Sequence, residues 1–261
     1  MFKLLETGRS HRVCWLVFCF SFLFFCSVGD AQTVGTGSPG LRIDVSGANE
    51  EGDLGLAIQL VIAMTILTLG PSVIMMMTCF TRIIIVLGFV RNAIGVNAAP
   101  SSQIIIGLGL FLTFFIMGPV WNKIYDDAVT PYMETAMKSS EALEVATAYM
   151  KDFMMNQTRQ EDAQFFLEIS RQGAMTRDEL PLSIVVPSFI LSELRTAFQM
   201  GFLIFIPFIV VDFIVASTLM SMGMMMMPPV VISMPFKLLL FVLVDGWYLI
   251  VQSLVESFNV S

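Results

Sequence analysis

Four long apolar runs constrain the fold of this chain more than any other feature of its sequence. They cover residues 54–80, 104–120, 201–221 and 230–255. About 20 apolar residues are enough to cross the hydrocarbon layer of a membrane as a helix. The composition agrees, because 56% of the 261 residues are hydrophobic and only 13% are charged, whereas about 25% are charged in soluble domains. We therefore predict an all-α membrane protein built from apolar helical hairpins.

The first thirty residues have the pattern of a secretory signal peptide. Lys3, Arg9 and Arg12 form a basic start, residues 13–28 form an apolar run, and a small residue stands at Ala31. We expect cleavage after Ala31. The alternative is an uncleaved anchor helix, for which this apolar run is short.

Cleavage would remove the histidine and most of the cysteines, two residue types that often serve in catalysis or metal binding. The only histidine, His11, and the cysteines Cys14, Cys19 and Cys26 all lie in that segment. Cys79 would remain, in an apolar run where a thiol is most often a small buried residue. No disulfide, His-based general base or His/Cys zinc site can then form within the mature chain. We expect no catalytic residue, no metal and no cofactor.

Composition divides the chain into five segments. They are a cleavable signal peptide (1–31), a flexible Gly- and Ser-rich segment (32–53), a first apolar helical hairpin (54–120), a polar domain (121–183) and a second apolar helical hairpin (184–261). In the polar domain, acids outnumber bases and apolar residues recur at helical spacing, as at Leu143, Ala146, Met150, Phe153 and Met154. We expect amphipathic helices there.

Arg82 and Arg91 are the only charged residues between positions 54 and 120, and they predict the orientation of the first hairpin. Short cytoplasmic loops concentrate Lys and Arg. This rule places the turn from Arg82 to Arg91 in the cytoplasm and the polar domain on the extracytoplasmic side. The signal peptide independently places Gln32 outside.

The segment MGMMMMPP separates the last two apolar runs. Pro228 and Pro229 prevent a helix from continuing, so we expect a tight hairpin turn. The four methionines that follow Gly223 cannot share one helix face, because neighbours are about 100° apart. These are Met224, Met225, Met226 and Met227. Their side chains are long and polarizable, so they suit a deformable seal; generic apolar filler is the alternative.

Five charged residues lie in or beside the last two apolar runs: Glu193, Arg195, Asp212, Lys237 and Asp245. Charge within a membrane is costly enough to be a functional hypothesis. Glu193 and Arg195 are two positions apart and so lie on nearly opposite helix faces. Each needs a partner elsewhere, which favours pairing between subunits; an ion or proton path is the alternative.

The two aspartates also raise the alternative of an intramembrane aspartyl protease, in which two carboxylates share a proton. Asp212 and Asp245 stand in the contexts VVDF and VDGW. Both contexts lack the Gly-x-Gly-Asp setting of that class. We therefore do not expect a protease.

Four long stretches of the chain resemble, in order, one family of membrane proteins. They are MTCFTRIIIVLGFVRNAIG (77–95), LGLFLTFFIMGPVWNKIYDDAVTPY (108–132), LPLSIVVPSFILSELRTAFQMGFLIFIPFIVVDFIVAS (180–217) and MGMMMMPPVVISMPFKLLLFVLVDGW (222–247). The chain resembles the FliP proteins of the flagellar type III export apparatus, whose virulence-secretion counterparts are the SctR proteins. The likeness extends over nearly all of the expected mature chain.

The resemblance implies a homopentamer that assembles with FliQ and FliR subunits into a closed, ring-shaped helical cone, through which unfolded flagellar proteins leave the cytoplasm. It implies that Gly223 and Met224 to Met226 form a sealing ring, to which we add Met227. It also implies subunit contacts at Glu193 and Lys237. We expect a location in the bacterial inner membrane, in the flagellar basal body, with contacts to other basal-body proteins and lipid but not to nucleic acid.

Two other functions remain as alternatives. An ion or small-solute transporter would use Asp212 and Asp245 as a relay, and discontinuous helices and inverted repeats would support that function. No second half of the sequence resembles the first. A purely structural scaffold for the basal body would differ from a gate in that substitutions in the pore would leave export unchanged.

The signal peptide generates a direct prediction. We expect the N-terminal sequence of the protein isolated from its membrane to begin at Gln32, because cleavage follows Ala31. Intact-mass measurement or N-terminal sequencing checks this. A mature chain that begins at Met1 would establish the anchor helix instead.

Overall fold

The computed structural model describes residues 52–95, 100–134, 137–171, 175–177, 179–224 and 228–258, with side chains from Ile58 onwards. The predicted signal peptide and nearly all of the predicted flexible segment lie outside these residues. The chain divides into two units at Ile58, and the first contributes only the start of one helix to the described residues. The second unit, from Gln59 onwards, holds the remainder of that helix and all the others.

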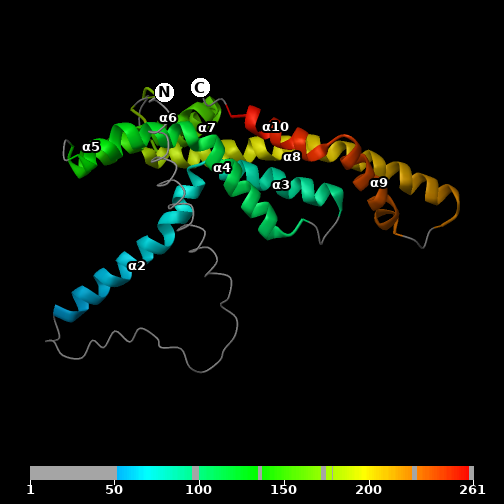
Figure 1. Cartoon of the computed structure of the whole chain (residues 1–261), viewed down its shortest axis with the longest axis horizontal. Coiled ribbons are helices and arrows are strands. Elements are labelled where there is room, and N and C mark those ends of the chain that lie inside the picture. The colour runs from blue at the N-terminus through cyan, green and yellow to red at the C-terminus, as the bar shows by residue number, and fades with distance from the viewer. Residues whose placement is uncertain are drawn as a thin grey trace, which may run out of the picture. The chain divides into compact units, whose positions relative to one another are not determined.

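Every regular element among the described residues is a helix (Figure 1). The helices are α2 (Gly52–Met76), α3 (Phe80–Ile94), α4 (Ser102–Ile124), a π-helical turn η1 (Tyr125–Val129), α5 (Thr130–Met133), α6 (Ser139–Gln157), α7 (Gln160–Ile169), α8 (Leu182–Ser221), α9 (Pro229–Leu243) and α10 (Gly246–Glu256). The predicted all-α fold is confirmed.

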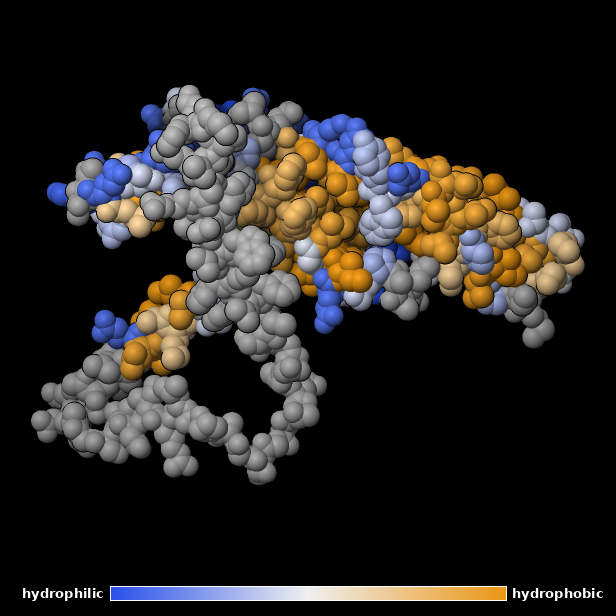
Figure 2. All heavy atoms as spheres, viewed as in Figure 1, coloured by the Kyte–Doolittle hydropathy of each residue, from blue (hydrophilic) through white to orange (hydrophobic). Residues whose placement is uncertain are grey.

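Three helical segments are long and apolar enough to cross a membrane. They are Ile58–Met76, Ser102–Met133 and Leu182–Ser221; α9 and α10 become a fourth if this bent pair counts as one span. All four overlap the apolar runs of the sequence, although the second and third extend well beyond them. Figure 2 shows the contrast between apolar residues over α8 and α9 and polar residues over α6.

The stretch between Arg82 and Arg91 is not a turn, contrary to our prediction, but the centre of helix α3. Its apolar residues Ile83, Val86, Leu87 and Val90 recur at helical spacing and are fully buried. The helix ends at Gly95, whose φ of 79° is the left-handed conformation that commonly closes a helix. The two arginines interrupt the hydropathy of the sequence without interrupting the helix.

Helix α8 organises the second unit. It has 40 residues, which corresponds to about 60 Å at 1.5 Å per residue, and it begins well before the predicted run at 201. Its first half packs against α3, α6 and α7, and its second half packs against α9 (Figure 1). Of the predicted apolar face of α6, Met150, Phe153 and Met154 are buried, whereas Leu143 is 66% exposed.

The fourth apolar run is also not one helix. It is broken between α9 and α10, whose axes differ by 62°. Asp245 at the break has a φ of 51°, in the left-handed region that few non-glycine residues adopt. A Cβ on the next residue, Gly246, would lie 2.3 Å from the ring of Phe241, so this close approach requires glycine.

Gly201 allows α3 and α8 to approach closely. A Cβ added there would lie 2.4 Å from Cδ2 and 2.6 Å from Cγ of Phe89, and Phe89 also packs edge-on against Phe198 at 5.3 Å between ring centroids. Because Cγ is near the root of the side chain, the ring has little freedom to move away.

We expect Gly201→Ala to destabilise the protein by about 1–3 kcal/mol through overpacking. Gly88→Ala is the matched control, since a Cβ there meets nothing within 4 Å and alanine favours the helix by about 0.5–1 kcal/mol. Thermal unfolding of the purified protein in detergent measures both. Equal effects of the two substitutions would contradict the close packing of Phe89 on α8.

Candidate functional site

A buried ion pair joins α3 to α8. Arg82 of α3 is 3% exposed and Glu193 of α8 is fully buried. The guanidinium of Arg82 donates two parallel hydrogen bonds to the carboxylate of Glu193, from Nε to Oε2 at 2.8 Å and from Nη2 to Oε1. This bidentate geometry is the strongest arrangement available to an arginine and a carboxylate.

The remaining donors of Arg82 also have acceptors. Nη1 donates to the carbonyl and hydroxyl oxygens of Ser257, at 3.1 and 3.0 Å, and Nη2 makes a long contact of 3.5 Å with Oε1 of Gln157. The ring of Phe258 lies 3.9 Å from Cζ of the guanidinium, close enough for a cation–π interaction. All five N–H groups of the guanidinium are thereby accounted for.

This cluster brings together four separate parts of the chain: α3, the end of α6, the middle of α8 and the residues after α10. We call it the Arg82 cluster, and its members are Arg82, Gln157, Glu193, Ser257 and Phe258. An isolated buried charge costs several kcal/mol, so Arg82 is stable here because its own hydrogen bonds are complete. Among the described residues, the amide nitrogen of Gln157 has no hydrogen-bond partner.

The Arg82 cluster changes the interpretation of two predicted residues. Glu193 needed a partner elsewhere, as its helical position required, and that partner is Arg82 of the same chain. The reason for expecting a partner in another subunit is therefore met within one protomer. Because Arg82 is buried and paired, it does not act as a loop charge, and the positive-inside argument now depends on Arg91 alone.

A second ion pair joins α8 to α9. Nζ of Lys237 donates to Oδ2 of Asp212 at 2.5 Å, and the hydroxyl of Ser233 donates to Oδ1 of the same carboxylate. Lys237 is 4% exposed. Ser233 and Lys237 are four positions apart and so share one face of α9. This spacing could have identified Ser233, which sequence analysis missed; nothing in the sequence pointed to Ser257 or Phe258.

The other predicted charges lie on the surface. Arg195 contacts Glu161 at 3.3 Å and Asp162 at 3.5 Å, both in the first turn of α7. Arg91 donates to the hydroxyl of Ser102 at 2.8 Å. The carboxylate of Asp245 is exposed. Asp212 and Asp245 therefore belong to different surroundings, the first paired with a lysine and the second open.

The methionine-rich turn begins where α8 ends. The N–H of Gly223 donates to the carbonyl of Met220 and the N–H of Met224 to that of Leu219, at 3.1 and 3.0 Å. With Gly223 at a φ of 75°, this is the Schellman arrangement that closes many helices. The glycine thus ends α8. Pro228 is instead the N-cap residue of α9, and Pro229 is its first residue, a position where proline is favoured.

Met224 is 40% exposed at this turn, whereas Met225, Met226 and Met227 lie outside the described residues. The role of all four as a seal stays a prediction. Among the residues that the structure describes, no group of three His, Cys, Asp or Glu side chains is arranged to hold a metal ion.

A further hydrogen bond lies within the predicted polar domain, between α6 and η1. The hydroxyl of Tyr149 in α6 donates to Oδ2 of Asp127 in η1. Because this bond stabilises the protonated tyrosine and places it beside a carboxylate, it raises the pKa of Tyr149. The bond connects α6 to the π-helical turn that follows α4.

Comparison with known proteins gives consistent matches. The sequence model of the FliP family matches residues 63–254. Flagellar biosynthetic protein FliP of Bacillus subtilis (strain 168) is 48% identical over 217 residues, which are 83% of this chain and 98% of that protein. The protein of the same name from Borreliella burgdorferi is 44% identical over 253 residues, 92% and 98% of the two chains. That from Caulobacter vibrioides is 50% identical over 203 residues, 77% and 76%.

The Arg82 cluster generates a stability prediction. Arg82→Ala and Glu193→Ala should each destabilise the protein by about 3–5 kcal/mol, because each leaves an uncompensated buried charge. Glu161→Ala is the control, since Glu161 is 84% exposed and its pair with Arg195 lies at the surface, where an ion pair contributes at most about 1 kcal/mol. Unfolding of the purified variants in detergent provides the measurement.

The double variant Arg82→Met/Glu193→Met distinguishes the ion pair from general packing. It should recover most of the lost stability, because no buried charge remains. Single and double variants of equal stability would contradict a coupled pair.

Proposed function

Because this chain is a member of the FliP family, and so a non-enzymatic membrane component of the flagellar export apparatus, we propose that it lines the gate through which unfolded flagellar proteins leave the cytoplasm. In this proposal, five copies assemble with FliQ and FliR subunits into a closed ring in the bacterial inner membrane. Further basal-body proteins surround the ring.

The observation that carries this proposal is the hairpin formed by α8 and α9. The first half of α8 is anchored by α3, α6 and α7 and by the Arg82 cluster. Its second half extends to the methionine-rich turn, which begins at Gly223. A rigid arm with a compliant, apolar tip suits a gate that must pass chains of varied shape and still block ions.

The surface of this hairpin supports assembly with apolar neighbours. The second half of α8 and helix α9 carry two charged side chains, Asp212 and Lys237, which neutralise each other. The exposed residues of α8 between Phe198 and Met220 are predominantly apolar, as are those of α9. This exposed stretch of α8 is about 33 Å long. Neighbouring subunits and lipid together would cover it.

Residues 121–183 fit a periplasmic domain in this proposal. Helices α6 and α7 carry most of the described acidic side chains of this stretch, whereas α4 carries a single charged side chain, Lys123, in its last turn. The support for a periplasmic location is the signal-peptide pattern together with Arg91. The two apolar regions would then be residues 54–120 and 184–261, although each holds three helices where composition predicted a hairpin.

An ion or small-solute transporter is less consistent with the side chains observed. A relay would need Asp212 and Asp245 free to exchange protons or ions, but Asp212 is held by Lys237 and Ser233. The break between α9 and α10 resembles the discontinuous helices of transporters. An export gate with buried, neutralised charges accounts for more of the observations.

The seal generates the functional test. Replacement of Met224, Met225 and Met226 with alanine should leave assembly intact and make the membrane leaky to small solutes, because the shorter side chains no longer fill the gap. Solute release from cells or vesicles that contain the assembled complex measures the leak. The matched control replaces three exposed methionines outside the hairpin, Met64, Met133 and Met175. An unchanged leak in a correctly assembled triple variant would remove the sealing role.

A further inference from the structure

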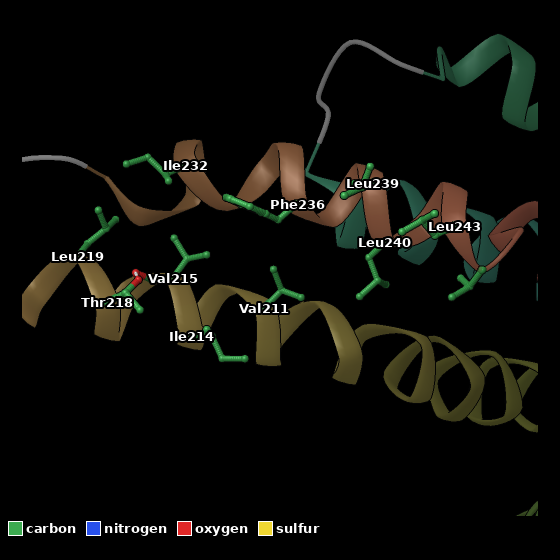
Figure 3. Close-up of a pocket in the computed structure, with 11 residues that line it drawn as sticks. Val211, Ile214, Val215, Thr218, Leu219, Ile232, Phe236, Leu239, Leu240 and Leu243 are labelled. Carbon is green, nitrogen blue, oxygen red and sulfur yellow. Dashed lines mark hydrogen bonds between the residues drawn. The ribbon is translucent and has the colours of Figure 1, made fainter.

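A hollow of about 750 Å³ lies between α8 and α9 (Figure 3). Val211, Val215 and Leu219 line it from α8, and Ile232, Phe236 and Leu240 line it from α9. The residues that line it are almost entirely apolar. Two of them are open to the surroundings, since Phe236 is 55% exposed and Leu243 is 75% exposed. We call it the hairpin groove. A volume of this size is typical of a small-molecule site, about 300–1,000 Å³.

The hairpin groove extends from near the methionine-rich turn to the bend between α9 and α10. On α9 its lining begins at Ile232 and ends at Val244. This interval corresponds to about 18 Å of helix. One leaflet of a bilayer core is about 15 Å thick, half of the whole. The length of the groove therefore fits a single acyl chain that lies along a leaflet.

The residues at the bend are those expected at the level of lipid headgroups. Asp245 directly follows the last lining residue, and Trp247 and Tyr248 come next, 38% and 62% exposed. Trp and Tyr concentrate at membrane–water interfaces. The exposed Asp245 carboxylate makes no hydrogen bond or ion pair with any residue that the structure describes.

The negative charge of Asp245 at the bend favours some lipid headgroups over others. The only cation in α9 and α10 is Lys237, which is buried and already paired with Asp212. An anionic headgroup would meet an unpaired carboxylate and no free cation from these two helices. A headgroup that carries an amine would instead find an opposite charge.

From these observations we infer that the hairpin groove binds one acyl chain of an amine-headed phospholipid, whose ammonium group pairs with Asp245. This inference deepens the proposed function, because it places the α8–α9 hairpin in contact with the bilayer. It does not depend on the methionine seal. The competing occupant is a helix of a neighbouring protein chain, and the experiment distinguishes the two.

Photo-crosslinking from within the groove provides the test. A benzophenone amino acid replaces Phe236, which lines the groove, or Phe213, a 74% exposed residue of α8 outside the lining. The assembled complex is placed in vesicles of equal parts phosphatidylethanolamine and phosphatidylglycerol, irradiated, and analysed by mass spectrometry. We expect lipid adducts at position 236 enriched about threefold in the ethanolamine lipid, as an exposed ion pair would give. Adducts at 213 should follow the composition of the vesicle.

Asp245→Asn in the same crosslinking protein tests the headgroup contact. Asparagine tolerates the left-handed backbone of this position, so the bend should be kept. The adduct at position 236 should persist but lose its preference for the ethanolamine lipid, whereas Asp245→Glu should retain the preference.

Three results would overturn the inference: a crosslink from position 236 to protein instead of lipid, adducts there that mirror the vesicle composition, or a preference that survives Asp245→Asn. Export is assayed separately in the same strains. A crosslink to protein together with normal export would contradict lipid binding in the hairpin groove but not the proposed function as an export gate. Export by the methionine variants tests the seal, and its outcome does not change the interpretation of the crosslinks from position 236.

Discussion

The guanidinium of Arg82 holds together segments that are far apart in the chain, and the remaining structure is arranged around it. Its partner Glu193 lies 111 positions away on α8, and Ser257 lies 175 positions away. A charge buried in an apolar core is tolerated only where its hydrogen bonds are complete. Here the requirement fixes the register of α3 on α8 and draws the residues after α10 onto the same helices.

The two ion pairs lie in different parts of the structure and have different roles. The Arg82 cluster lies where α8 is covered by α3, α6 and α7, whereas the pair of Lys237 and Asp212 lies within the projecting hairpin. Because each pair is neutral as a whole, the surrounding surfaces remain apolar. The structure can thus present a long apolar hairpin to lipid or protein while charges specify how its helices meet.

Sequence patterns predicted the helical fold and the apolar runs, because hydropathy over about 20 residues is a strong signal. They missed helix α3, since Arg82 and Arg91 look like loop charges until a buried partner is known. They also missed the bend at Asp245, which depends on one backbone angle and on the ring of Phe241 over Gly246. The pairing of Glu193 with Arg82 could not be predicted, because no local periodicity connects residues 111 positions apart. Family resemblance, not periodicity, supplied the function.

The contact of Arg82 with Ser257 also bears on the order of biosynthesis. Arg82 and Glu193 have both left the ribosome well before Ser257 is made, because that residue follows Arg82 by 175 positions. Until then two donors of the guanidinium lack their final acceptors, and the core around α3 and α8 cannot close in its finished form. Closure of this core is therefore coupled to the synthesis of the residues that follow α10. A chain that lacks Ser257 would leave Nη1 of Arg82 without these two acceptors, with a partly unsatisfied cation between α3 and α8.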